Sequence, residues 1–180
     1  MITRSQAEDM LHRMTQSPSL LRHMRTVALV MEAYAHHLGE NPDEWFITGL
    51  LHDADYEAHP DKHPDIVVDE LVKMGEETIA YAISAHYTKW GVPAQSRLDT
   101  ALLACDELTG FIVACSQIRP DGIAGLEVKS VVKKLKDKGF AAKVERDEVT
   151  KGIAAFGVDP EMHIDFIINV LRKNRALLGI

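Results

Sequence analysis

A histidine and an aspartate, His52 and Asp53, stand side by side at the end of a strongly apolar run over residues 45–51. Burying an ionised aspartate beside an imidazole costs several kcal/mol unless another group compensates. A divalent metal ion compensates, because it bonds to both side chains and offsets the carboxylate charge. The pair therefore predicts half of a metal site. The alternative is a helix C-terminal histidine favoured by the helix dipole, followed by a solvated aspartate.

Two further polar residues interrupt apolar helix faces. His23 lies beside the apolar row of the helix expected over residues 18–38, so its imidazole should point inward. Asp106 falls on the apolar row of the helix expected over residues 97–118, where Asp106 and Glu107 are the only charges after residue 100. Separate buried polar groups would each need their own explanation. A single ion bound by His23, His52, Asp53 and Asp106 explains them together.

This donor set predicts the type of metal and the chemistry. Two imidazoles and two carboxylates suit Mn²⁺, Fe²⁺, Co²⁺, Ni²⁺ or Mg²⁺ rather than a thiolate-bound zinc. Such an ion activates water and neutralises charge on a phosphoryl group. The chain shows no Gly-rich phosphate loop and no serine nucleophile elbow, so the metal should carry the chemistry. We expect Asp53 and Asp106 in the catalytic centre, with Asp106 or His59 moving the proton.

The order of these residues resembles the HD superfamily of metal-dependent phosphohydrolases, which is named after the His-Asp dipeptide. The resemblance extends from His23 to the C-terminal helix, and it implies an all-α helical bundle with the metal site in its core. Within the superfamily, the chain looks like a small bacterial branch of predicted hydrolases. Many relatives continue the dipeptide with Gly-Lys, whereas this chain has Asp55-Tyr56, so no lysine contact to substrate is expected there. The segments that carry the closer likeness are residues 50–57, His63-Pro64 and residues 106–110.

The resemblance also implies a second ion. HD proteins with two metals supply further histidines between the dipeptide and the last aspartate, and His63 and His86 resemble those positions. Asp53 would then bridge the ions. His59-Pro60 repeats the pattern of His63-Pro64, and we favour His63 because an apolar helix starts directly after it. The alternatives are a loop residue for His63 and a helix-end residue for His86.

Three classes of function are compatible with these residues. The leading interpretation is a phosphohydrolase, either a phosphomonoesterase or a phosphodiesterase, that cleaves a small phosphate ester or nucleotide with metal-activated water. The second is a non-catalytic module that senses phosphorylated ligands. The third, implied by some HD proteins, is a dinuclear-iron oxygenase.

A basic stretch follows the ligand helices. Its inward row of valines and a leucine indicates that most of the cations form a solvated face, with one or two as candidates to hold a phosphate. Arg119 is a similar candidate. The stretch comprises Lys129, Lys133, Lys134, Lys136, Lys138, Lys143 and Arg146.

Length and composition predict one soluble globular domain over residues 1–180, with 46% hydrophobic and 26% charged residues, and the resemblance implies that this domain is of the HD type. The formal net charge of −7 disfavours nucleic acid or an anionic membrane as the primary partner. A small phosphorylated molecule remains compatible, because a bound ion reverses the local field. No pattern predicts an oligomeric state.

Cysteine usage and the N-terminal residues predict a cytoplasmic protein. Cys105 and Cys115 are ten positions apart on one expected helix, hence ~15 Å apart and outside disulfide reach. We expect both to be reduced core residues. Residues 1–6 lack the apolar core of a signal peptide, and no apolar stretch approaches the ~20 residues that span a bilayer.

Helical periodicity and punctuation run through nearly the whole chain, with a capping residue before proline at residues 17–18, 41–42 and 159–160. Irregular stretches at residues 55–63 and 88–95 adjoin candidate ligands, so we expect them to select the substrate. Four other histidines, His12, His36, His37 and His163, lack a carboxylate partner and should be structural or solvated. Helices are expected over residues 3–14, 18–38, 42–54, 64–74, 76–87, 97–118, 127–138, 147–156 and 160–177.

Overall fold

The computed structural model describes residues 2–180, and the predicted all-α class is confirmed. The described residues form α-helices joined by turns and two 3-10 helices, with no β-strand among them. The helices are α1 (Arg4–Met14), α2 (Pro18–Leu38), α3 (Pro42–Leu51), α4 (Asp65–Lys73), α5 (Glu77–Ser84), α6 (Arg97–Gln117), α7 (Val128–Leu135), α8 (Arg146–Phe156), α9 (Pro160–Lys173) and α10 (Arg175–Leu178). The 3-10 helices are η1 (Pro60–Lys62) and η2 (Thr88–Trp90).

Most helix ends lie within a few residues of the positions predicted from capping signals. The Asn41 side chain accepts hydrogen bonds from the first amides of α3, and the Asp159 side chain accepts from the Met162 amide at 3.0 Å. Two predictions need correction. Helix α3 ends at Leu51, so His52 and Asp53 lie in the turn after it. The predicted C-terminal helix is divided at Asn174, which ends α9 and precedes α10.

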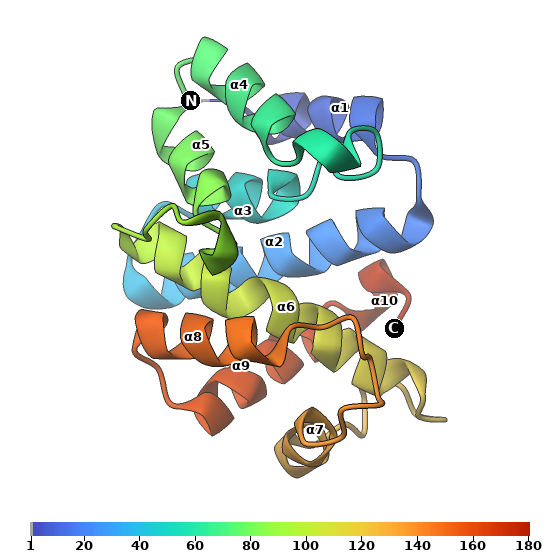
Figure 1. The fold of residues 1–180 in the computed structure, drawn as a ribbon. Coiled ribbons are helices and arrows are strands. Elements are labelled where there is room, and N and C mark those ends of the chain that lie inside the picture. The colour runs from blue at the N-terminus through green and yellow to red at the C-terminus, as the bar shows by residue number, and fades with distance from the viewer. Residues whose placement is uncertain (1) are drawn as a thin grey trace.

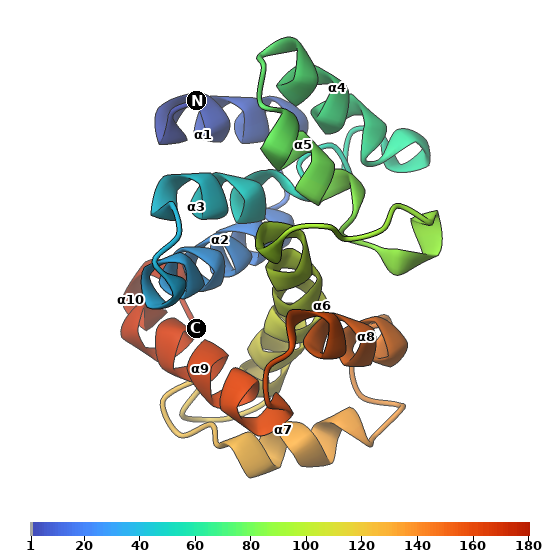
Figure 2. The same ribbon diagram turned by 90° about the vertical axis from the view of Figure 1, so that its left-hand side faces the viewer.

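Helix α2 lies between two buried apolar clusters. One cluster gathers side chains of α1, α3, α4 and α5, and α2 contributes Met24 and Ala28 to it. The other gathers side chains of α6, α8 and α9, and α2 contributes Val27 and Met31 to it. Figures 1 and 2 show the corresponding arrangement, with α1, α4 and α5 at one end of the molecule and α7, α8 and α9 at the other. Residues on α2 can therefore face both halves.

Two glycines permit close helix contacts that bring site elements together. A Cβ atom at Gly49 would lie 2.8 Å from the Ala28 Cα, so the missing side chain lets α3 approach α2. A Cβ atom at Gly152 would overlap the backbone of Leu103, so α8 lies directly against α6 for the same reason. The first contact sets the end of α3 beside α2, and the second holds α8 against the helix that carries Asp106.

Both cysteines are buried and free, as expected from their spacing. Among residues 2–180, no helix combines the length and the apolar character that crossing a bilayer requires.

Candidate metal centre

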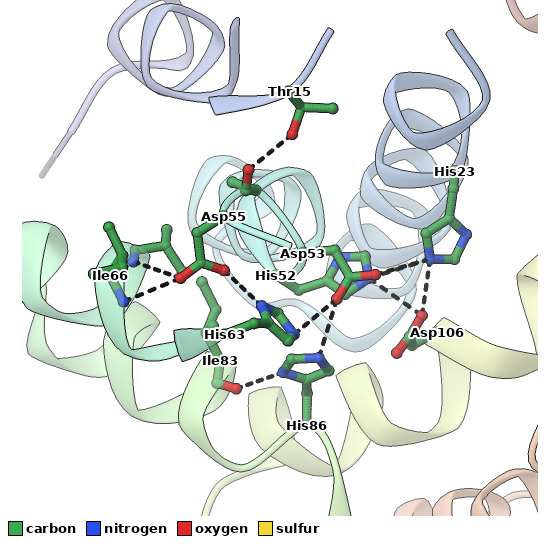
Figure 3. Close-up of polar contacts among 12 residues, drawn as sticks. Thr15, His23, His52, Asp53, Asp55, His63, Ile66, Ile83, His86 and Asp106 are labelled. Atoms are coloured by element: carbon green, nitrogen blue, oxygen red, sulfur yellow. Dashed lines mark hydrogen bonds and ion pairs between the residues drawn. The ribbon is translucent and has the colours of Figure 1, made fainter. Parts of the chain in front are cut away.

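The structure brings the six predicted metal ligands together at one place (Figure 3). They come from segments far apart in the sequence, and each lies on a helix or directly after one. His23 lies on α2 and Asp106 on α6. The remaining four, His52, Asp53, His63 and His86, follow the ends of α3, η1 and α5.

Asp53 lies in the middle of this cluster, and its two oxygens face opposite ways. Its Oδ2 atom is 3.6 Å from Nε2 of His52 and 3.8 Å from Nε2 of His23. Its Oδ1 atom is 3.2 Å from Nε2 of His63 and 3.4 Å from Nε2 of His86. Residues 2–180 thus contain two groups that could each hold a metal ion, and the groups share Asp53.

Asp106 adds a second carboxylate to the group formed by His23 and His52. Its Oδ1 atom lies 3.0 Å from Nε2 of His23 and 3.2 Å from Nε2 of His52. The two histidine Nε2 atoms are themselves 3.3 Å apart. If both of these nitrogens carry a lone pair, or both carry a hydrogen, they repel each other at that distance. A proton shared between them or a cation bound by both removes the repulsion. This crowding of donor atoms fits a cation.

Three of the imidazoles are held in the orientation that metal ligands need. The Nδ1 atom of His52 donates to the Gly49 carbonyl at 2.8 Å, and that of His86 donates to the Ile83 carbonyl at 2.5 Å. The Nδ1 atom of His63 lies 2.5 Å from a carboxylate oxygen of Asp55. Because Nδ1 carries the hydrogen in each ring, Nε2 of the neutral ring keeps a lone pair directed at the cluster.

Asp55 is a site residue that the sequence analysis missed. It is fully buried, and its Oδ2 atom accepts hydrogen bonds at 3.0 Å from the amides of Ile66 and Val67 at the start of α4. Its other oxygen orients His63. Asp55 therefore ties the turn after α3 to the segment that carries His63. Nothing in its sequence context distinguishes it from a solvated loop aspartate.

The turn that carries the His-Asp dipeptide is also fixed to α1. Thr15, at the end of α1, is fully buried, and its hydroxyl donates to the Ala54 carbonyl at 2.8 Å (Figure 3). Because Ala54 follows Asp53 directly, this bond limits the movement of the Asp53 backbone. The Asp53 carboxylate is thereby held between the two histidine pairs.

Charges in the cluster compensate one another when no ion is bound. Burial would lower the pKa of His52, but Asp53 and Asp106 raise it to about 9. The pKa of His63 is likewise about 9, because hydrogen bonds with Asp53 and Asp55 outweigh its burial. Burial would raise the pKa of Asp53, but His52, with hydrogen bonds from His63 and His86, brings it well below its usual range. The protonated rings of His52 and His63 therefore supply positive charge to these carboxylates.

Five of the six clustered residues, all except the fully buried His52, line a cavity of about 490 Å³. Aromatic residues form one wall, and Trp90 on η2 lies with its ring 4.8 Å from that of His86 and 5.3 Å from that of His63. The opposite wall comes from α6 and from residues 143–145. Trp90 lies in the stretch over residues 88–95 that the sequence analysis expected to border the site. The further aromatic residues lining the cavity are Tyr56 and Tyr87.

Two glutamates attach the C-terminal half of the chain to the site. Glu148 on α8 is only 2% exposed, and its carboxylate accepts from the amide of Thr88 at 2.9 Å and from its hydroxyl at 2.6 Å. This holds η2, and hence Trp90, over the histidines. Glu107 lines the cavity and accepts from the amide of Glu145 at 3.3 Å. Burial, reinforced by Asp106, raises the pKa of Glu107 to about 7.

His59 needs correction as a candidate for proton transfer. It is exposed and is not among the residues that line the cavity. Only its backbone is engaged, through bonds with Asp55 and Lys62, because η1 begins directly after it. Of the two His-Pro pairs, the one at residue 63 therefore faces the cluster. His163 is a buried structural residue between Tyr34 and the Ala104 carbonyl.

A family model described as HD domain matches residues 20–110, which include all six clustered residues. No curated protein and no solved structure matches the chain. Residues 143–145, which also line the cavity, lie outside the matched range.

The affinity of the ion-free protein for Mn²⁺ is expected to rise with pH. His52 and His63 have pKa values of about 9, so they are protonated at neutral pH and must lose these protons to bind an ion. Each displaced proton should raise the affinity about tenfold per pH unit up to about pH 9. Calorimetric titrations from about pH 6 to 8.5 measure this slope, and a pH-independent affinity would contradict the assignment. By the same linkage, the raised pKa values of His52 and His63 make the stability of the ion-free fold depend on pH. Their contribution to the free energy of unfolding is complete below about pH 6.5 and is lost as the pH rises toward 9.

Replacing Asp55 with asparagine should weaken binding of one ion by about 10- to 100-fold, because His63 loses its charged orienting partner. The asparagine oxygen can still accept from the amides at the start of α4, so the fold should be retained. Metal titration with circular dichroism measures both effects, and His59→Ala serves as an exposed histidine control. Unchanged affinity in Asp55→Asn would show that His63 does not bind metal.

Proposed function

The chain belongs to the HD-domain family, and on this premise we propose that it is a metal-dependent phosphohydrolase that cleaves a small phosphate ester or nucleotide. One observation carries the proposal: the Asp53 carboxylate lies between two pairs of inward-facing histidine Nε2 atoms at the floor of a cavity. That arrangement provides donors for two ions with one shared ligand. The open side of the cavity gives a substrate access to both groups.

The residues divide into two ligand sets. His23, His52, Asp53 and Asp106 would hold one ion, and Asp53, His63 and His86 would hold the other. When bound, divalent ions supply Lewis acidity toward a phosphoryl group and make water acidic enough to react near neutral pH. The nitrogen and carboxylate donors suit Mn²⁺, Fe²⁺, Co²⁺, Ni²⁺ or Mg²⁺.

Lys143 supplies the positive charge that the protein itself brings to the cavity. It is the only lysine or arginine among the residues lining the cavity, and it makes no ion pair with any residue from 2 to 180. Lys89, by contrast, pairs with Glu145 at 3.2 Å. Lys143 is therefore free to contact an anionic oxygen of the substrate. Among the lysines of the basic stretch, Lys143 lines this cavity, and a lysine that contacts the substrate phosphate must do so.

Glu107 is placed to hold or move a proton. Its carboxylate lines the cavity next to Asp106 and is fixed by the Glu145 amide. Asp106 is less suited to this role, because its Oδ1 atom is already engaged by His23 and His52. The aromatic wall around Trp90 limits water around the reacting group and contacts the organic part of the substrate.

The test is a screen for turnover with protein that has been freed of metal and then reloaded. Phosphomonoesters and phosphodiesters would be supplied with Mn²⁺, Co²⁺, Ni²⁺ or Mg²⁺, and metal-dependent release of phosphate or alcohol is the expected result. Asp53→Asn should lower kcat/KM at least about 100-fold, because both ligand sets lose the shared charge. Asp61→Asn, an exposed aspartate on η1, is the matched control.

Two other outcomes would contradict the proposal. Metal-dependent binding of phosphorylated compounds without turnover would indicate a ligand-sensing module. Substrate oxidation that requires iron and O₂ would indicate a dinuclear-iron oxygenase.

Glutamine substitutions should separate the roles of Glu107 and Lys143. Glu107→Gln keeps an acceptor for the Glu145 amide but cannot exchange a proton, so kcat should fall about 100-fold with metal content unchanged. Lys143→Gln removes a substrate contact and should mainly raise KM. Steady-state kinetics of both variants, with metal analysis, test this pair of expectations. An unchanged kcat in Glu107→Gln would remove this residue from the proton path.

A further inference from the structure

A second, smaller cavity adjoins the metal site. It has a volume of about 240 Å³ and lies between the N-terminal half of α2 and the C-terminal half of α6. The two cavities share His23 and Gly110 as lining residues, so they meet at that point. We call the smaller cavity the recess. Its other lining residues are Ser19, Arg22 and Thr26 on α2 and Val113, Ala114 and Gln117 on α6.

Gly110 lies where the two cavities meet, in the interior of α6. Glycine destabilises a helix interior relative to alanine, so its presence there needs a reason. Packing does not supply one, because a Cβ atom at Gly110 would lie 3.5 Å from His23, an ordinary contact distance. Gly152 differs, since its Cβ would overlap the Leu103 backbone. A methyl group at position 110 would instead occupy space that both cavities border.

Arg22 makes the recess suitable for an anion. This arginine is partly buried, and its guanidinium forms no hydrogen bond or ion pair with any residue of the described range. Its neighbour Arg25 is paired with Glu8 at 3.2 Å. No carboxylate lines the recess, whereas hydroxyl and amide groups do. A free guanidinium among neutral polar groups recognises phosphate or carboxylate oxygens.

We propose that the recess is a second anion subsite, and that the substrate is an organic phosphate carrying a further anionic group. The proposal rests on the phosphohydrolase function of the neighbouring site. The reacting phosphoryl group lies at the metal cluster, the chain of the substrate passes Gly110, and Arg22 binds the second anionic group. The eight residues from Gly110 to Gln117 extend about 10 Å along α6, which sets the scale for the separation of the two anionic groups.

Equilibrium binding of non-hydrolysable probes tests the subsite independently of turnover. Hexane-1,6-diphosphonate has two anionic ends, and hexylphosphonate has the same chain length with one. Calorimetry on the Mn²⁺-loaded protein should show at least about tenfold tighter binding of the diphosphonate, since a charge-assisted contact is added. A third probe, 6-phosphonohexanoate, shows whether a carboxylate serves as well as a phosphonate. Equal affinities for the two-ended and one-ended probes would overturn the proposal.

Arg22→Gln should remove the preference for the two-ended probe, lowering the affinity ratio about 10- to 100-fold. Arg25→Gln is the matched control, because Arg25 is on the same helix but lines neither cavity. The control should keep the wild-type ratio, and both variants should keep the wild-type metal content. A wild-type ratio in Arg22→Gln would show that Arg22 does not bind the second anion.

Gly110→Ala gives an independent test of the connection between the cavities. Alanine is the better helix former, so Tm should rise, while the preference for the diphosphonate should fall because the passage is narrower. A lower preference together with a higher Tm separates this effect from misfolding. An unchanged preference would show that no ligand passes this point.

Failure of this proposal and failure of the proposed function give different results. If phosphate esters are hydrolysed but the two probes bind equally, the recess is not a subsite and the catalytic assignment stands. If the diphosphonate is preferred but no phosphate ester is hydrolysed, the recess binds anions and the phosphohydrolase function is wrong, so the recess does not select a substrate.

Discussion

The partly buried Asp53 carboxylate, surrounded by four histidines, is the constraint on which the rest of the site depends. A carboxylate in such surroundings is stable only if positive charge lies close to it. In the ion-free chain that charge comes from imidazolium protons, because His52 and His63 both have pKa values of about 9. Two metal ions would supply it more fully, since each Asp53 oxygen already faces one pair of Nε2 atoms. The same geometry that compensates the carboxylate charge therefore provides the donor atoms for the proposed metal ions.

The remainder of the chain holds this geometry in place and closes the cavity. Helix α2 carries His23 between the two apolar clusters, and Gly49 allows α3 to approach it closely. The part of the cavity wall that lies outside the family match is a loop held by backbone contacts of an arginine. There Arg146 donates to the carbonyl oxygens of Ala141 at 2.6 Å and Val144 at 2.9 Å, which shapes the loop that carries Lys143. The part of the chain that the family model matches thus supplies the clustered histidines and aspartates, and residues 143–145 complete the cavity wall.

Residues that interrupt a regular pattern could be predicted from the sequence, whereas residues that act through tertiary contacts could not. His23 and Asp106 break apolar helix faces, so periodicity alone indicates that they point inward. Asp55 and Glu148 are more deeply buried than His23 and Asp106, but they lie in a turn and on the polar start of a helix, where acidic residues are usually solvated. The choice between His59 and His63 shows the same limit. Both histidines precede a proline. His63 differs in its tertiary contact with the Asp55 carboxylate, which orients its ring toward the cluster.

The central claim, that Asp53 bridges two metal ions, is tested most directly by anomalous X-ray diffraction from crystals of the Mn²⁺-loaded protein. The account predicts two anomalous peaks on opposite sides of the Asp53 carboxylate, ~3.5–4 Å apart as in other two-metal sites. One peak should lie among His23, His52 and Asp106, and the other between His63 and His86. A single peak, or none within bonding distance of Asp53, would contradict the account.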